Sequence, residues 1–313
     1  MISTDLHSGY DRSMKIAAII PCFNEEASIS SVVLALASEV PGISVYVCDN
    51  GSTDRTVEAA VAAGATVLSE KRKGKGNAVR RLFRDIDADV YIMIDGDNTY
   101  GTGMISEAIQ LIASGHDMVT GERMLSTVNQ RKGHAFGNKL FTQLLRSLFN
   151  VSSKDVFSGL RVMSRRLVKT FPCVSLEFEL EAELEIFCAR MRLPVSSLPT
   201  SIRERVNSES KLNTIKDGLK ISALALRMLH REYPLRLYLP LFALIETSCL
   251  LISIPLLHTY LETGLVPRFP TLIILATVAL VGFSSLAMGL ILKEITNSRY
   301  ESRYLRYLDI KSS

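Results

Sequence analysis

Two aspartates that follow an apolar segment have the spacing needed to bind one divalent cation. They lie in VYIMIDGDNTYG, residues 90–101, where Gly96 separates Asp95 from Asp97. Mg²⁺ usually takes one or two carboxylates and leaves its other positions to water and substrate phosphates. The stretch therefore suggests a metal–diphosphate site. An ordinary surface turn is the alternative, because Asp, Gly and Asn all favour turns.

Other site classes are excluded by spacing and composition. An EF-hand calcium loop needs Gly and Glu at its sixth and twelfth positions, but counted from Asp95 these hold Tyr100 and Ser106. The five cysteines are scattered and form no C-x-x-C pair, which argues against a zinc site or a disulfide framework. A net charge of +4, without zinc-finger spacing, does not indicate a nucleic-acid partner.

A second candidate for anion binding is the basic segment KRKGKGNAVRR, residues 71–81. It is not a Walker A loop, because Lys75 is followed by Gly76 and not by Ser or Thr. Glycines flanked by lysines at the start of a helix can still bind an anion through backbone N–H groups. A solvated basic helix face is the alternative.

The elements that must position these residues alternate along residues 14–123. Short apolar runs that read as strands end in polar clusters, and helical stretches follow them at about 25–38, 53–63, 76–87 and 103–114. This rhythm predicts an α/β fold with a parallel sheet covered by helices, in which ligands bind beyond the carboxyl ends of the strands. The polar strand ends are residues 21–26, 49–54, 95–97 and 121–123.

The C-terminal third is different in character. Residues 237–257 and 271–292 are each about as long as the roughly 20 residues needed to cross a bilayer, and Glu246 is their one charge. A buried pair of soluble helices is the alternative. Because basic residues flank the pair and are scarce in its connector, both ends are expected in the cytoplasm. Glu246 is a candidate for pairing inside a bundle or for facing a cavity, and its presence is compatible with helix–helix association and a homo-oligomer.

These observations predict five segments. The segment before the apolar pair has helical apolar spacing with Lys and Arg on its other face, which suits a helix lying on the membrane surface. The expected boundaries are a polar tail at 1–13, a catalytic domain at 14–213, an amphipathic helix at 214–233, a membrane hairpin at 234–293 and a basic cytoplasmic tail at 294–313.

Seven motifs together resemble one known family. In order they are IIPCFNEE, VCDNGSTD, GKGNAVRR, MIDGDNTYG, GER, SGLRVMSRR and RERVNSESKL. The chain resembles family 2 glycosyltransferases, whose GT-A domain is a Rossmann-like nucleotide-sugar-binding fold. Within that family it looks like the membrane-bound polyprenyl-phosphate sugar transferases related to dolichol-phosphate mannose synthase. The C-terminal hairpin is similar to that of the bacterial branch.

The resemblance implies roles for individual residues. Asp95 and Asp97 fall at the position that holds Mg²⁺ or Mn²⁺ and the diphosphate, and Thr99 replaces a Gln that ligates the metal in some relatives. Asn50 replaces a more common Asp and removes one charge near the nucleotide. For nucleotide-sugar binding the resemblance further implies Pro21, Phe23, Glu25, Asp49, Lys75, Gly96 and Arg161. The cations implied for the donor diphosphate or the acceptor phosphate are Arg123, Arg161, Arg205 and Lys211.

The implied activity is an inverting transfer of a sugar from a UDP- or GDP-sugar to a polyprenyl phosphate, undecaprenyl phosphate being expected, at the cytoplasmic face of the inner membrane. Asp155 is the candidate base or positioning group, with simple pairing to Arg161 or Lys154 as the alternative. A processive polysaccharide synthase is disfavoured because its Q-x-x-R-W motif needs a Trp, which the chain lacks. Intact motifs oppose a decayed, non-catalytic anchor. Transfer to a sugar hydroxyl or another lipid is the second hypothesis.

Overall fold

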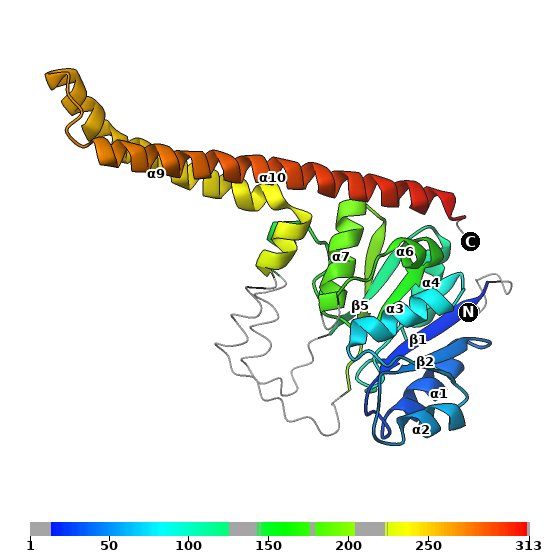
Figure 1. The fold of residues 1–313 in the computed structure, drawn as a ribbon. Helices are drawn as coiled ribbons and strands as arrows, with labels where there is room; N and C mark the ends of the chain where they lie inside the picture. The colour runs from blue at the N-terminus through cyan, green and yellow to red at the C-terminus, as the bar shows by residue number, and fades with distance from the viewer. Residues whose placement is uncertain are drawn as a thin grey trace. The chain divides into compact units, whose positions relative to one another are not determined.

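The computed structural model describes residues 14–124, 143, 145–175, 179–203, 223 and 225–311. The chain divides into two compact units, which are shown in Figure 1. Unit 1 comprises Met1–Thr214 together with Arg303–Ser313, and unit 2 comprises Ile215–Ser302. The last residues of the chain, from Arg303, thus belong with unit 1.

Unit 1 is built on a mixed sheet of seven strands in the order β3-β2-β1-β4-β6-β5-β7. The first four strands are parallel, as expected, and Cys22 pairs with Asp49 where β1 and β2 end. β6 runs antiparallel to both of its neighbours, which the strand–helix rhythm did not predict. The strands are β1 (Ile16–Cys22), β2 (Ser44–Asp49), β3 (Thr66–Ser69), β4 (Val90–Met93), β5 (Met118–Arg123), β6 (Arg161–Ser164) and β7 (Val195–Thr200).

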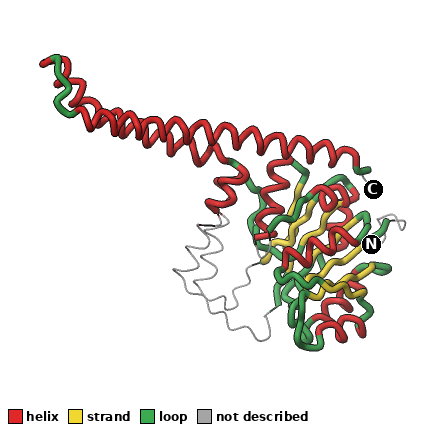
Figure 2. The backbone as a smooth tube through the Cα atoms, viewed as in Figure 1, coloured by secondary structure: helices red, strands yellow, loops and turns green. Residues whose placement is uncertain are grey.

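Helices cover both faces of this sheet (Figure 2). Alternate strand side chains pack with α1, α2 and α4 into one apolar core on one face. Aromatic rings fill the other face: Phe83 of α3 lies edge-on to Tyr91 and Phe171, and Phe171 contacts Phe187 of α7. The helices are α1 (Ile29–Glu39), α2 (Thr56–Ala62), α3 (Lys75–Asp85), α4 (Ile105–Ala113), α6 (Arg165–Thr170) and α7 (Glu179–Met191). The α/β class expected from the sequence is confirmed.

Unit 2 contains α9 (Pro234–Thr263) and all but the last turns of α10 (Phe269–Asp309), two long apolar helices that lie side by side. The rings of Phe242 and Phe283 meet at a centroid distance of 5.3 Å. Large apolar side chains such as Leu244, Leu261 and Leu280 are exposed, unlike those of a helix pair inside a soluble core. Both helices are long and apolar enough to span a membrane.

The C-terminal end of α10 belongs to unit 1 and is helical to Asp309, where a basic tail was expected. Tyr307 is buried and donates a hydrogen bond to Asp117 Oδ2 at 2.7 Å, and the Arg166 guanidinium lies 4.8 Å from its ring centre. Asp117 is fully buried and also accepts a hydrogen bond from Ser164 Oγ. Burial and the Asp117 carboxylate raise the pKa of Tyr307, so the phenol stays a donor at neutral pH.

Tyr307→Phe should destabilise unit 1, because it removes only the hydroxyl and leaves Asp117 Oδ2 without its donor. Loss of a hydrogen bond to a buried charged group typically costs about 1–3 kcal/mol. Thermal unfolding in detergent is the measurement, and Tyr304→Phe, at a tyrosine that is 46% exposed, is the matched control. Equal midpoints for the two variants would show that the Tyr307 contact contributes nothing.

Candidate functional site

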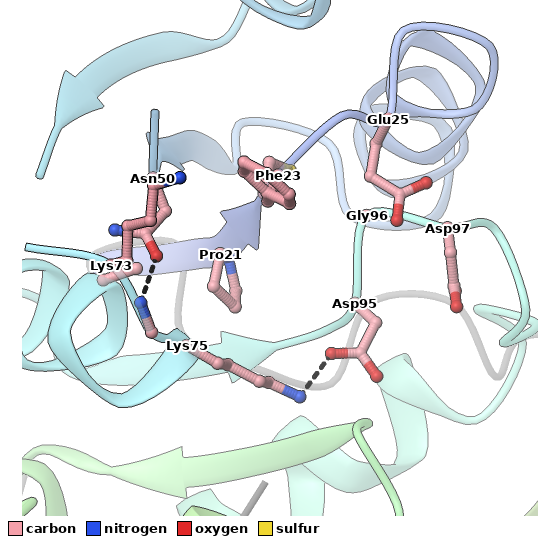
Figure 3. Close-up of a pocket in the computed structure, with 12 residues that line it drawn as sticks. Pro21, Phe23, Glu25, Asn50, Lys73, Lys75, Asp95, Gly96 and Asp97 are labelled. Atoms are coloured by element: carbon pink, nitrogen blue, oxygen red, sulfur yellow. Dashed lines mark hydrogen bonds and ion pairs between the residues drawn. The ribbon is translucent and has the colours of Figure 1, made fainter. Parts of the chain in front are cut away.

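A pocket lies at the carboxyl ends of β1, β2 and β4, where the sequence placed its polar clusters. Its cavity volume is about 480 Å³, within the range of small-molecule sites. The chain segments that form it are far apart in sequence and converge because parallel strands end at one edge of the sheet (Figure 3). Its lining residues are Pro21, Cys22, Phe23, Glu25, Asn50, Lys73, Gly74, Lys75, Ala78, Asp95, Gly96 and Asp97.

Both aspartates of the DGD motif line this pocket. Asp97 Oδ1 accepts the backbone N–H of Thr99 at 3.0 Å, which fixes the turn after β4. Gly96 is required between them, because a Cβ there would lie 2.6 Å from Cys22 Sγ. The surface-turn alternative is therefore insufficient, since the turn presents two carboxylates to a cavity and not to open solvent.

Asp95 is held by an ion pair with Lys75, the first residue of α3. Lys75 Nζ lies 2.5 Å from Asp95 Oδ1 and 2.5 Å from Glu181 Oε1 of α7. The Lys75 side chain is only 14% exposed, so it is part of the pocket wall and not of a solvated basic face. Burial alone would lower the pKa of Lys75, but the charges of Asp95 and Glu181 outweigh burial and raise it.

The antiparallel strand β6 brings the SGLR motif to the same edge. Because Met93 of β4 pairs with Arg161 at the start of β6, the residues before β6 lie beside those after β4. A Cβ on Gly159 would overlap Asp95 Oδ2, so only glycine allows this approach. Tyr100 Oη accepts the Gly159 backbone N–H at 2.8 Å and links the two loops.

Other motif residues form hydrogen bonds that hold together the loops after β1 and β2, which border the pocket. The Asn24 backbone N–H donates to Ser52 Oγ at 2.9 Å, and Asn24 Oδ1 accepts from the Thr53 N–H at 2.8 Å. The Glu25 N–H donates to Thr56 Oγ1 at 2.8 Å, which joins the loop after β1 to the start of α2. The expected helix at 25–38 begins only at Ile29, because residues 24–28 are used in this junction.

Asn50 fixes the basic loop between β3 and α3. Its Nδ2 donates to the carbonyls of Glu70 at 3.0 Å and Arg72 at 2.7 Å, and its Oδ1 accepts from the Gly74 N–H at 2.7 Å. An aspartate could make only the last of these bonds. Replacing the more common Asp by Asn50 therefore does more than remove a charge. The Asn50 amide also holds the loop so that Lys73 and Gly74 lie at the pocket.

Two other expected site residues, Asp49 and Arg161, have structural partners away from the pocket lining. Asp49 accepts the N–H groups of Gly51 and Ser52 and so caps the turn after β2. Arg161 is fully buried and pairs with Glu185 at 2.8 Å, which contradicts its assignment as a phosphate ligand. Its remaining nitrogens donate to the carbonyls of Ser158 and Val156.

Arg123 and Asp155 form a bidentate pair, with both nitrogen–oxygen distances 2.6 Å. Asp155 therefore pairs with Arg123, and not with Arg161 or Lys154 as the alternative supposed. The hydrogen bonds to Asp155 keep the pKa of Arg123 above its ordinary value, so this guanidinium is charged at any working pH. Arg205 and Lys211 lie outside the described residues.

The donor set suits a hard divalent cation. Asp95 and Asp97 supply carboxylate oxygens to one cavity, and Thr99 Oγ1 on the same loop is buried with no hydrogen-bond partner among the residues described. No cluster of three His, Cys, Asp or Glu side chains is present in the described part of the chain. A cation here would thus be completed by water and ligand oxygens, as is usual for Mg²⁺.

Comparison with known proteins identifies the family. Residues 17–171 match the sequence model of Glycosyl transferase family 2. Protein RfbJ of Shigella flexneri is 49% identical over 39% of this chain and 97% of its own length. A dolichyl-phosphate hexose transferase of Haloferax volcanii is 30% identical over 66% of this chain and 90% of its own length. The chain belongs to glycosyltransferase family 2.

The GT-A fold of this glycosyltransferase is supported independently by solved structures. Glucosyl-3-phosphoglycerate synthase from Mycobacterium tuberculosis, in complex with Mn²⁺, UDP and glucosyl-3-phosphoglycerate, superposes with a TM-score of 0.55. The two proteins share 23% sequence identity over 69% of this chain and 79% of the other. At that identity the likeness concerns the fold alone.

Asn50→Asp should loosen the basic loop while the sheet stays intact. The carboxylate cannot donate to Glu70 and Arg72 and would face their carbonyls, so the loop loses two hydrogen bonds, each worth about 1 kcal/mol. Amide hydrogen exchange of residues 70–74 should accelerate about tenfold or more, since a tenfold change corresponds to about 1.4 kcal/mol. Asn98→Asp, at a half-buried position in the loop after β4, is the control. Unchanged exchange in 70–74 would contradict the role given to Asn50.

Proposed function

We propose that this glycosyltransferase transfers a sugar from a nucleotide-diphosphate sugar to a polyprenyl phosphate, with undecaprenyl phosphate the expected acceptor, and inverts the anomeric centre. The observation that carries the proposal is a pocket with two metal-binding carboxylates in a chain that also has two apolar helices long enough to span a membrane. The dolichyl-phosphate hexose transferase relative supports a lipid phosphate as acceptor.

The nucleoside end of the donor lies against Phe23 and Pro21 in this proposal. The Phe23 ring is 48% exposed at the pocket, which leaves a face on which a nucleobase or ribose can stack. Lys73 Nζ lies 5.7 Å from the centre of that ring and supplies positive charge beside it. UDP and GDP are both compatible donors by this chemistry, because stacking does not select a base.

The diphosphate lies between the DGD loop and the N-terminus of α3. Asp95 and Asp97 would hold Mg²⁺ or Mn²⁺, which would supply Lewis-acid neutralisation of the departing nucleotide diphosphate. Lys75 and the backbone N–H groups at the start of α3 add positive potential from the protein side. Neutralisation of the leaving group is the main requirement, since the acceptor phosphate is already an anion at neutral pH.

The acceptor phosphate is bound by cations on the other side of the donor. Arg123 is the described candidate, and Asp155 holds its guanidinium in a fixed orientation through both carboxylate oxygens. We assign Asp155 to this positioning role, because both of its oxygens already accept hydrogen bonds from Arg123. Arg205 and Lys211 of the RERVNSESKL motif complete the proposed phosphate site. Attack by a phosphate oxygen on the anomeric carbon inverts its configuration.

Membrane association keeps the lipid tail in the bilayer while the phosphate reaches the site. Basic residues precede α9 and follow the apolar part of α10, which favours a cytoplasmic location for both ends. We therefore assign the reaction to the cytoplasmic face of the inner membrane, where nucleotide sugars are available.

The function is tested with membranes that contain the protein, undecaprenyl phosphate and a panel of labelled UDP- and GDP-sugars. One donor should yield a labelled product that extracts into organic solvent and is released by mild acid, as a glycosyl phosphate would be. Membranes without the protein are the control. Label found only in water-soluble glycan, with the lipid phosphate present, would overturn the proposed acceptor and favour transfer to a sugar hydroxyl.

Asp97→Asn should nearly abolish this transfer without unfolding the protein. The change removes one ligand charge at a strand end and leaves the core intact, and loss of Lewis-acid assistance costs several kcal/mol of transition-state stabilisation, or about 10³-fold in rate. Glu107→Gln, at an exposed acid on α4, is the matched control. Full activity in EDTA would contradict the metal role directly.

A further inference from the structure

Glu181 is a buried acid beside the pocket that the motifs did not single out. It is 2% exposed, and its Oε1 lies 2.5 Å from Lys75 Nζ. Its other oxygen, Oε2, is buried and has no hydrogen-bond partner among the described residues. Burying a carboxylate with one unsatisfied oxygen costs free energy, so the presence of Glu181 at this buried position needs an explanation.

The neighbouring acids of α7 have structural partners instead. Glu183 accepts the backbone N–H groups of Val174 and Ser175, and Glu185 pairs with Arg161. Glu181, by contrast, contacts Lys75, which lines the pocket. It therefore contacts the site through Lys75 and does not itself line the cavity.

The contact between Glu181 and Lys75 changes the net charge that is available to bind a cation. Lys75 bridges Asp95 and Glu181 at equal distances of 2.5 Å, so its positive charge is shared between the two acids. With Glu181 present, Lys75 and Glu181 cancel, and Asp95 and Asp97 together keep two negative charges for a divalent cation. Without the charge of Glu181, Lys75 would pair with Asp95 alone and would oppose a cation held by the same carboxylate.

We propose that Glu181 is a positioning residue that shares the Lys75 ammonium with Asp95 and neutralises its charge, so that the two aspartates keep enough negative charge to bind a divalent cation. This inference rests on the proposed function for the identity of the metal site. Lys75 then remains beside the cation, held by Glu181, where it can contact the donor diphosphate.

Mn²⁺ binding to the purified full chain tests the inference without the acceptor or turnover. The concentration of free Mn²⁺ is measured by electron paramagnetic resonance, with and without UDP or GDP. Glu181→Gln should raise the Kd for Mn²⁺ by about tenfold or more, because the uncompensated Lys75 charge opposes the metal. Lys75→Met should lower the Kd, because it removes the competing cation.

The double variant Lys75→Met/Glu181→Gln decides between this mechanism and the alternatives. It replaces the Lys75–Glu181 ion pair, whose net charge is zero, by two uncharged side chains. The net charge at the site is therefore unchanged, and the Kd for Mn²⁺ should return to within about threefold of the wild type. Glu183→Gln, on the same helix, is the matched control and should leave the Kd unchanged. Unfolding midpoints of all four variants separate a loss of fold from a loss of binding.

Three results would overturn the inference, and the first two are distinct from failure of the proposed function. A double variant that binds Mn²⁺ as weakly as Glu181→Gln would show that Glu181 acts on the metal directly and not through Lys75. A Glu181→Gln variant with wild-type affinity would show that its charge is irrelevant, while the transferase proposal would stand. A wild-type chain that binds no Mn²⁺, even with nucleotide, would remove the metal site itself and this inference with it.

Discussion

The ion pair between Asp95 and Lys75 is the interaction around which the pocket is arranged. It joins the end of β4 to the start of α3, and Glu181 extends it to α7, so three separate elements must meet at one point. Removing one partner of a buried pair leaves an uncompensated charge, which is far more costly than the pair is favourable. The positions of these elements are therefore coupled, because the folded state must keep all three charges together.

Close backbone approach is the second constraint, and it explains why glycines recur in the motifs. Gly96 lets the DGD loop pass Cys22 Sγ, and Gly159 lets the chain before β6 pass over the Asp95 carboxylate. Because β6 is antiparallel to β4, the start of one strand lies beside the end of the other. The mixed sheet thus brings the segment before β6 against Asp95, a pocket residue, although that segment does not itself line the cavity.

Much of this site could be predicted from the sequence, because parallel strands carry their terminal residues to one edge. Pro21, Phe23, Glu25, Lys75 and the DGD loop all line one pocket for that reason. The predictions failed where a side chain's partner lies far away in the sequence. Arg161 reads as a phosphate-binding cation, yet it pairs with Glu185 in the core, and Glu181, 106 residues from Lys75, reads as an ordinary acid of a helix. Local spacing does not encode which distant group neutralises a buried charge.

Arg161 nevertheless contributes to the site through the helix that it contacts. Glu181 and Glu185 are four residues apart on α7 and so lie on the same face, one turn from each other. Arg161 and the Thr120 hydroxyl both bind Glu185 Oε1, at 2.8 and 3.1 Å, and these bonds fix the rotation of α7 about its axis. That rotation sets where the Glu181 carboxylate meets Lys75. Arg161 does not line the pocket. Because it holds Glu185, it nevertheless helps to set the position of the Glu181 carboxylate one helical turn away, and so the charge beside Lys75.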